Sequence, residues 1–215
     1  MLFKPLKGKK VKDKKIYDDA FSKYLLFAKK IVPMTAFTEQ ICRYCMPLIH
    51  FKKGEVIYHA GDIHHSGYYI SSGLCRSYLI SDTGKEITWE FYFNDKNSSY
   101  LNLIAGDYNS FIQDKPSNLY IEVLEDTYCF EFKNEGRDFI FKMMKTPMTF
   151  AKFLCQEYNK EMLNRYLDLN TSADDKVEKF FQNKGFLLEK VSQNQIASYL
   201  GITHETFSRL KKRYS

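Results

Sequence analysis

The sequence predicts an α+β protein in which an antiparallel β-roll is followed by a long helix and a small helical domain. Three observations support this fold class. Between residues 50 and 132, short runs rich in Ile, Val, Tyr and Phe are separated by glycine-containing turns, which favours antiparallel strands. Residues 146–170 carry apolar side chains at helical spacing, and the last two dozen residues hold two short amphipathic segments joined at a glycine.

Composition supports a folded protein of one or two domains. The chain has 215 residues, 44% of them hydrophobic and 16% aromatic, so it can bury a sizeable core. The formal net charge is +6, but residues 1–15 hold seven lysines against one aspartate and therefore carry the whole excess. Overall charge is thus weak evidence for a nucleic-acid partner, and only local basic clusters bear on that question.

The predicted location is the cytoplasm. No stretch reaches the roughly 20 apolar residues that span a bilayer, so no membrane partner is expected. The Lys-rich N-terminus lacks the apolar region of a signal peptide. Five scattered cysteines, an odd number, are typical of reduced thiols in a reducing compartment.

Two groups of residues are of types that bind metals, but neither has the spacing that a metal site needs. Cys42 and Cys45 form a lone pair on a predicted helix, whereas an iron-sulfur cluster needs four thiolates, so buried thiols are the favoured interpretation. A metal site inside a β-roll needs histidines at i and i+2, but His64 and His65 are adjacent and fit a loop better; His59 stands apart from them. We therefore expect no catalytic residue, no metal and no cofactor, and hence no enzyme.

The N-terminal third is expected to begin with helices. Residues 1–15 fit a solvated basic tail, and the apolar positions from Tyr17 to Val32 predict a helix that ends before Pro33. Thr35 can cap the next helix. In the strand region, Ser72-Gly73 and Asp82–Lys85 are predicted turns, the second of them in a hairpin. The expected organisation is a basic tail and first helix (1–35), a roll (36–145), a long helix (146–170) and a helical domain (171–215).

The long helix is predicted to begin at Pro147, because proline suits the first helical position. Its apolar side chains recur every four residues: Phe150, Leu154, Tyr158, Met162 and Tyr166. Such a stripe either packs on its own domain or pairs with a second copy of the chain. We favour a homodimer interface, because a reader built from two short helices usually works on paired half-sites.

The C-terminal segment carries the signature of two capped helices that meet at a tight corner. Ser192 and Gln195 form a capping box, Gly201 can end the first helix in a left-handed conformation, and Thr203 can cap the second. Phe207, Leu210 and Tyr214 then share one face of the second helix, and polar side chains occupy the other.

This pattern fits a helix-turn-helix, whose second helix enters the DNA major groove. Arg209 could pair with guanine, and Glu205 could accept from cytosine. The alternative is an ordinary amphipathic hairpin in which Glu205 and Arg209 form an i, i+4 ion pair. Residues expected at the DNA are Ser192, Gln193, Thr203, His204, Glu205, Thr206, Ser208, Arg209, Lys211, Lys212 and Arg213.

Residues 193–210 resemble the recognition motif of the Crp/Fnr (cyclic-AMP receptor / fumarate-nitrate regulator) transcription factors. Residues 51–62, 68–78 and 84–87 follow the order of the family's cyclic-nucleotide-binding β-roll, so the resemblance covers roughly residues 36–213. It implies that Glu205 and Arg209 read bases and that Ser208 is the small residue between them. His204 departs from the family, whose other members carry a basic residue or Pro there.

The resemblance also implies where a cyclic nucleotide would bind, and this sequence departs from that pattern. Members that bind one present a Gly-Glu pair to the ribose and Arg followed by Ser or Thr to the phosphate. This chain has no Arg between Arg76 and Arg137, and Pro116-Ser117 stands where Arg-Ser would be expected. Only Lys115 offers a substitute charge. We expect no cyclic-AMP binding and leave the effector, if there is one, unassigned.

The predicted function is a homodimeric, sequence-specific regulator of transcription that binds double-stranded DNA at a near-palindromic site. RNA polymerase and an unidentified small molecule are further candidate partners. The alternative is a small-molecule sensor whose helix-turn-helix is vestigial or docks a protein partner.

Overall fold

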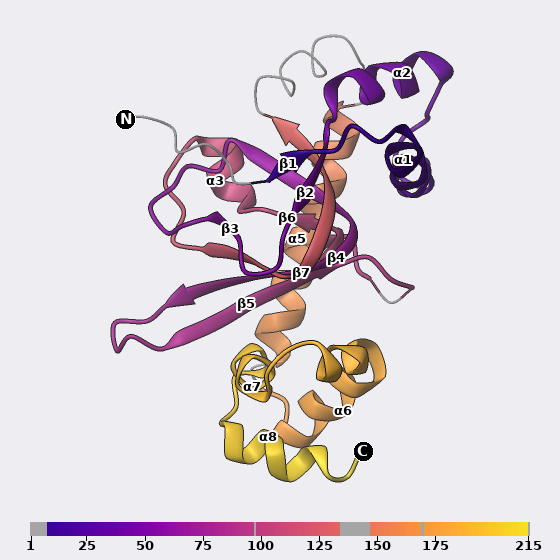
Figure 1. Cartoon of the computed structure of the whole chain (residues 1–215). Helices are drawn as coiled ribbons and strands as arrows, with labels where there is room; N and C mark the ends of the chain where they lie inside the picture. Colours follow the sequence, from indigo (N-terminus) through magenta and orange to yellow (C-terminus); the bar gives the residue numbers. More distant parts are fainter. Residues whose placement is uncertain (1–7, 97, 134–146, 169, 215) are drawn as a thin grey trace.

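The computed structural model describes residues 8–96, 98–133, 147–168 and 170–214; the side chains of residues 147–151 and 154 lie outside this description. Figure 1 shows a β-roll with helices α1 and α2 at one end and a unit of three helices, α6, α7 and α8, at the other. Helix α5 runs along the roll and connects it to that unit. No helix among the described residues is long and apolar enough to cross a membrane.

The roll is a single antiparallel sheet of seven strands in the order β1-β2-β7-β4-β5, with β3 also paired to β7 and β6 to β4. This confirms the predicted α+β class. The strands are β1 (Lys9–Lys10), β2 (Leu48–Phe51), β3 (Val56–Tyr58), β4 (Ser66–Ile80), β5 (Glu86–Phe93), β6 (Ile104–Ala105) and β7 (Tyr120–Lys133).

Two strands are much longer than the glycine spacing indicates. β4 has 15 residues and β7 has 14, and they pair with each other along most of their length. The predicted turn at Ser72-Gly73 is wrong, because Gly73 lies inside β4 where the register with β7 shifts. Its φ is +99°, and a Cβ would come within 2.5 Å of the Asp126 carbonyl oxygen. The glycine therefore permits a bulge in a continuous strand.

The predicted tail is also wrong at its C-terminal end. β1 pairs with β2, and helix α1 (Lys14–Ala28) begins earlier than Tyr17, because the Asp13 carboxylate caps it by accepting from the Lys15 and Ile16 amides. Helix α2 (Ala36–Cys45) is capped by Thr35 as predicted. Helix α1 buries Phe21 and Tyr24 against Phe130 of β7, which closes the end of the roll.

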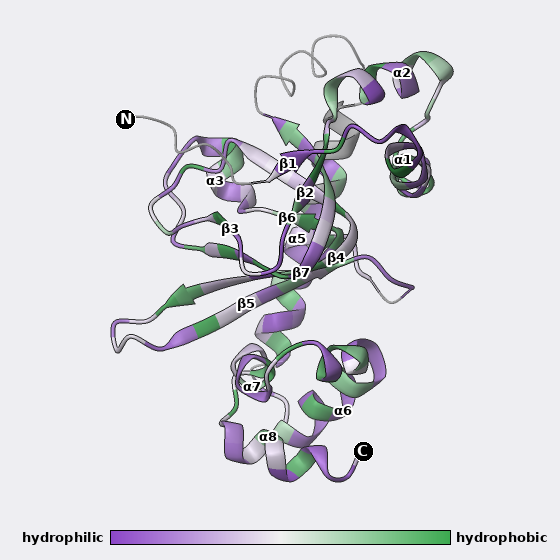
Figure 2. Cartoon of the chain, viewed as in Figure 1, coloured by the Kyte–Doolittle hydropathy of each residue, from purple (hydrophilic) through white to green (hydrophobic). Residues whose placement is uncertain are grey.

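The C-terminal helices are α5 (Pro147–Asp168), α6 (Ala173–Lys184), α7 (Gln193–Leu200) and α8 (His204–Lys211), with a 3-10 turn (Gly185–Glu189) between α6 and α7. In Figure 2, hydrophobic and hydrophilic residues alternate along each helix of the small unit, as in amphipathic helices. Its core, which includes Phe180, Ile196 and Phe207, is continuous with Phe91 and Phe93 of β5. The helical unit is thus docked on the roll.

Candidate nucleic-acid interface

The corner between α7 and α8 has the geometry that the sequence predicts. The Ser192 hydroxyl accepts from the Gln195 amide (3.2 Å), and the Gln195 side chain accepts from the Ser192 amide (3.0 Å). Gly201 ends α7 with φ +66°, in the left-handed region. Thr203 then caps α8 by accepting from the Thr206 amide (3.2 Å). Local hydrogen bonds alone therefore set the chain direction at the corner.

One face of α8 is buried and the other is open to solvent. Phe207 and Leu210 are buried in the core of the helical unit, and Tyr214 is half-buried. Of the predicted DNA contacts, Thr206, Ser208, Lys211 and Gln193 are half-buried, and Ser192, Thr203, His204, Glu205, Arg209, Lys212 and Arg213 are exposed. Helix α8 lies on the side of the unit away from the roll (Figure 1).

The two predicted base readers are free to contact a partner. Glu205 and Arg209 make no ion pair with each other in the described structure, in contrast to the alternative of an i, i+4 pair. Hydrogen bonds to its own backbone amide and to Thr203 lower the pKa of Glu205, so at neutral pH it is a carboxylate that can accept hydrogen bonds. The adjacent Arg213 already pairs with Asp174 of α6 (3.1 Å), which would compete with a phosphate contact.

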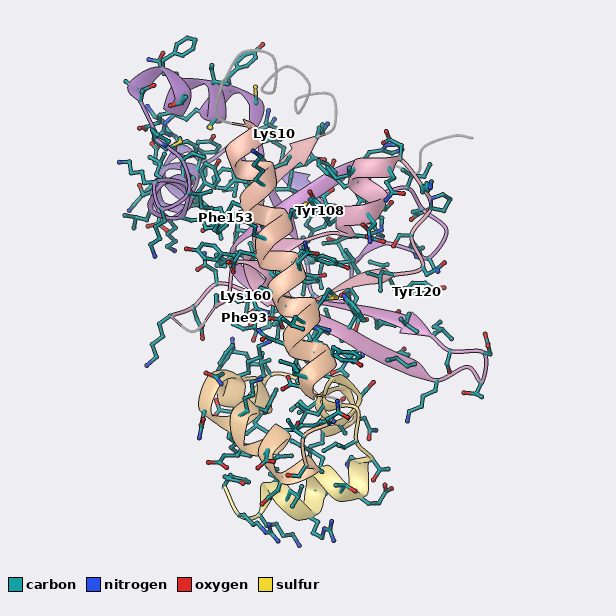
Figure 3. The ribbon with its side chains drawn as sticks, turned by 180° about the vertical axis from the view of Figure 1, so that it is seen from behind. Lys10, Phe93, Tyr108, Tyr120, Phe153 and Lys160 are labelled. Carbon is teal, nitrogen blue, oxygen red and sulfur yellow. The ribbon has the colours of Figure 1, made fainter. Side chains whose placement is uncertain are left out.

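The residues of the predicted dimer stripe differ in their exposure: Tyr158 and Met162 are half-buried, whereas Tyr166 is exposed. Phe150 and Leu154 lie outside the described side chains. The Tyr158 ring lies 6.1 Å from that of Tyr108 in the same chain, and Phe153 packs edge-on against Tyr100 (4.6 Å between ring centroids). Figure 3, which views the molecule from behind, labels Tyr108 and Phe153 beside α5. Met162 is half-buried and Tyr166 is 65% exposed.

An exposed apolar face does occur on α5, nearer its C-terminus. Leu163 and Leu167 are 58% and 55% exposed and flank Tyr166 at helical spacing. The predicted stripe has Leu163 beside it and leaves out Leu167, because a repeat of four residues drifts around a helix that has 3.6 residues per turn. Spacing of i, i+3 and i+4 groups Leu163, Tyr166 and Leu167 together.

In the roll segment 106–118, the chain's own Asp107 carboxylate occupies the N-terminus of a short helix. Helix α3 (Tyr108–Gln113) is capped by Asp107, whose carboxylate accepts from the Asn109 amide (2.9 Å) and the Ser110 amide (3.3 Å). The same carboxylate accepts from the Ser117 hydroxyl (2.7 Å). The amides at this helix N-terminus and the serine of Pro116-Ser117 are therefore engaged within the chain. Arg76, on β4, is paired with Glu86 and Glu122 (both 2.6 Å).

Aromatic side chains form part of the roll's core near this helix. Tyr58, Tyr68 and Tyr92 are buried there. The His64 ring is fully buried, stacks on Tyr58 (3.8 Å between centroids) and accepts from the Asp107 amide through Nδ1 (2.9 Å). Burial lowers the pKa of His64 to about 4, so the ring is neutral at pH 7.

In the described part of the chain, the histidines and cysteines considered as metal ligands do not lie together in one group. His64 is buried in the loop before β4, whereas His59 is exposed beside Asp62. Cys42 is buried and Cys45 half-buried on α2. Within the described residues, no group of three or more His, Cys, Asp or Glu side chains could hold a metal ion.

Comparison with known proteins gives consistent relatives, although no family model matches the chain. The anaerobic regulatory protein of Haemophilus influenzae is 25% identical over 174 residues, which cover 76% of this chain and 65% of that protein. The transcriptional activator protein Anr of Pseudomonas protegens is 25% identical over 175 residues, covering 76% and 68%. The fumarate and nitrate reduction regulatory protein of Salmonella typhimurium is 25% identical over 174 residues, covering 76% and 66%.

The solved structures agree on the fold. FixK2 from Bradyrhizobium japonicum matches with a TM-score of 0.61 at 20% identity, over 78% of this chain and 83% of that one. A chain from Eubacterium rectale described as a regulator of the Crp/Fnr family matches with a TM-score of 0.62 at 20% identity, over 90% and 87%. The chain is thus similar in sequence to these regulatory proteins, and it shares the fold of the Crp/Fnr-family structure.

The chain spans about 65% of the length of the Haemophilus influenzae protein. The structural matches, at 20% identity, establish the shared fold and leave ligand and DNA sequence open.

Proposed function

We propose that the protein is a Crp/Fnr-type transcription regulator that binds double-stranded DNA through α8. The single observation that carries this proposal is the solvent-exposed face of α8, where Glu205 and Arg209 flank Ser208 on a helix capped at its N-terminus by Thr203. A recognition helix needs exposed side chains at its N-terminal end that can donate to and accept from base edges. Both kinds of group are present and unpaired with each other.

The proposed active species is a homodimer. The exposed Leu163, Tyr166 and Leu167 on α5 provide an apolar face for a second copy, and a twofold axis there would place two α8 helices on the same side of the molecule. Recognition helices in such dimers enter major grooves about 34 Å apart, which matches a near-palindromic site. RNA polymerase is a candidate partner of this DNA-bound dimer.

Cyclic AMP is not part of the proposal. The Asp107 carboxylate occupies the amides that open α3 and engages Ser117, so a cyclic phosphate would meet a negative charge there. Tyr58, Tyr68 and Tyr92 are buried in the core of the roll. An effector, if one acts, would need different chemistry.

The test is selection of bound sequences from random duplexes by the purified full-length chain. We expect enrichment of two inverted half-sites. Equal recovery of all sequences would contradict DNA reading and would favour the alternative, a sensor whose helix-turn-helix is vestigial or docks a protein. Sedimentation of the unbound protein tests the dimer separately, with Leu163→Glu as the variant and the exposed Leu26→Glu, on α1, as its control.

A further inference from the structure

One acidic side chain of the roll is buried at the junction with the helical unit. Glu90 lies in the aromatic run of β5 and is 4% exposed. Its carboxylate pairs with Arg165 of α5 and with Lys184 of α6 (3.2 Å). It also accepts from the Phe91 amide (2.9 Å). A single carboxylate thus connects the roll, the long helix and the helical unit.

Neighbouring hydrogen bonds extend this contact to α7. The Lys184 ammonium donates to the Tyr199 hydroxyl (2.6 Å). The Ser198 hydroxyl accepts from the Thr88 amide (2.9 Å) and donates to the Glu86 carbonyl (3.2 Å). Helix α7 is therefore held against β5 by specific polar contacts as well as by apolar packing.

Arg165 ties the end of α5 to the same strand. Its guanidinium donates to the Trp89 carbonyl (2.7 Å) and lies 4.7 Å from the centre of the Trp89 ring. The position of α5, the helix that carries the proposed dimer face, is consequently fixed relative to β5 at the residue next to Glu90.

The balance of charge makes Glu90 the central member of this group. Burial by itself would raise the pKa of Glu90, but Lys184 and Arg165 hold that pKa below its usual value. Burial would likewise lower the pKa of Lys184, and Glu90 raises it instead. Arg165 and Lys184 both pair with the Glu90 carboxylate. Loss of this carboxylate would therefore remove a shared counter-charge from two buried or half-buried cations.

We propose that Glu90 is a positioning residue that fixes α7 and α8 relative to α5 and thereby sets the half-site spacing that the dimer accepts. The spacing part rests on the proposed function, because it needs two α8 helices on one duplex. The physical reason is geometric. The dimer face is on α5 and the reading face is on α8, and Glu90 binds cations from α5 and α6 simultaneously.

The first test measures the junction without DNA, by amide hydrogen exchange of the full chain. Glu90→Gln should speed exchange in residues 86–93 and 193–200 by about tenfold or more, because a broken buried ion pair favours local opening. Glu125→Gln is the matched control. The Glu125–Lys190 pair (2.8 Å) joins the roll to the residues just before α7 but is solvent-exposed, so exchange there should stay near the wild-type rate.

A second variant keeps the test decisive if Glu90→Gln fails to fold. Lys184→Met leaves Glu90 paired with Arg165 and removes only the connection to α6 and Tyr199. We expect faster exchange in residues 193–200 while residues 152–168 of α5 stay protected. Wild-type exchange rates at the junction in the folded Glu90 or Lys184 variant would overturn the positioning role.

The second test uses a series of duplexes whose selected half-sites are moved apart in steps of one base pair. The wild type should prefer one spacing, and Glu90→Gln should reduce the preference over the next-best spacing by about tenfold while binding to a single half-site stays unchanged. An unchanged spacing preference would overturn the spacing claim. A wild type that selects no sequence would instead contradict the proposed function, and the exchange measurement would still report on the junction.

Discussion

The α7–α8 corner and the α3 segment of the roll are both built around a capped helix N-terminus, but they use it differently. At α8, Thr203 satisfies one amide through a neutral hydroxyl, and the charged side chains beyond it face solvent. At α3, Asp107 places a carboxylate on the free amides and is held there by Ser117. The N-terminus of α8 therefore presents charged side chains to solvent, whereas the N-terminus of α3 is hydrogen-bonded within the chain.

This difference shows why a family's fold and its ligand can separate. A helix N-terminus attracts an anion wherever it occurs, but it can bind an external one only if the chain has not supplied its own. In the roll, the Asp107 carboxylate is bonded on both sides within the chain, to amides of α3 and to Ser117. At α8 the Glu205 carboxylate also bonds its own amide, but its side chain is exposed, so this end of the helix stays accessible to a partner.

The largest expected effect concerns the core that the helical unit shares with β5 of the roll. Phe207→Ala should lower the free energy of unfolding by about 3–5 kcal/mol, because this fully buried ring packs in a cluster that continues into β5. Urea denaturation measures it, with the exposed Phe37→Ala as a control expected to change stability by less than about 0.5 kcal/mol. A loss no larger than that of the control would contradict a shared core between the helical unit and the roll.

The next effect sharpens the account of the α8 face. Arg209→Ala should cost about 1–3 kcal/mol on the selected sequence and relax the preference at one base pair, whereas Lys212→Ala should weaken binding to all sequences alike. Affinities for selected and random duplexes at several salt concentrations measure this. Equal losses on both duplexes for Arg209→Ala would reassign that residue to phosphate.

The roll should respond to acid through His64. In the folded protein the pKa of His64 is lowered to about 4. Between about pH 4 and pH 6.5 the unfolded chain therefore binds a proton at His64 that the folded chain does not bind. The free energy of unfolding consequently rises with pH across this range. Going from pH 7 to pH 5.5 should therefore cost about 1.2 kcal/mol. Urea denaturation at both pH values should show that His64→Gln removes this component, and an equal pH dependence in that variant would exclude His64 as its source.

The smallest effect tests the filled anion position directly. Asp107→Ala should destabilise the protein by about 1 kcal/mol through loss of the α3 cap. Cyclic AMP should leave the thermal midpoint of the wild-type protein unchanged. A rise of that midpoint with the nucleotide would break the comparison between the two sites, because the position would then accept an external anion despite Asp107.

Features that depend on neighbours within one helical turn could be predicted from the sequence. The Ser192–Gln195 box, the left-handed Gly201, the Thr35 and Thr203 caps and the amphipathic faces of α8 are all local, so residue type and spacing suffice to place them. The antiparallel class was also readable, from alternating runs and turn residues.

Contacts between distant segments could not be predicted from local spacing. Gly73 lies at a bulge because β4 pairs with β7 more than 50 residues later. Glu90 interrupts the aromatic run at the end of β5, but its two cations come from helices about 75 and 94 residues away. Such pairings have no signature in spacing, because the energy that selects them arises only when the chain buries those groups together.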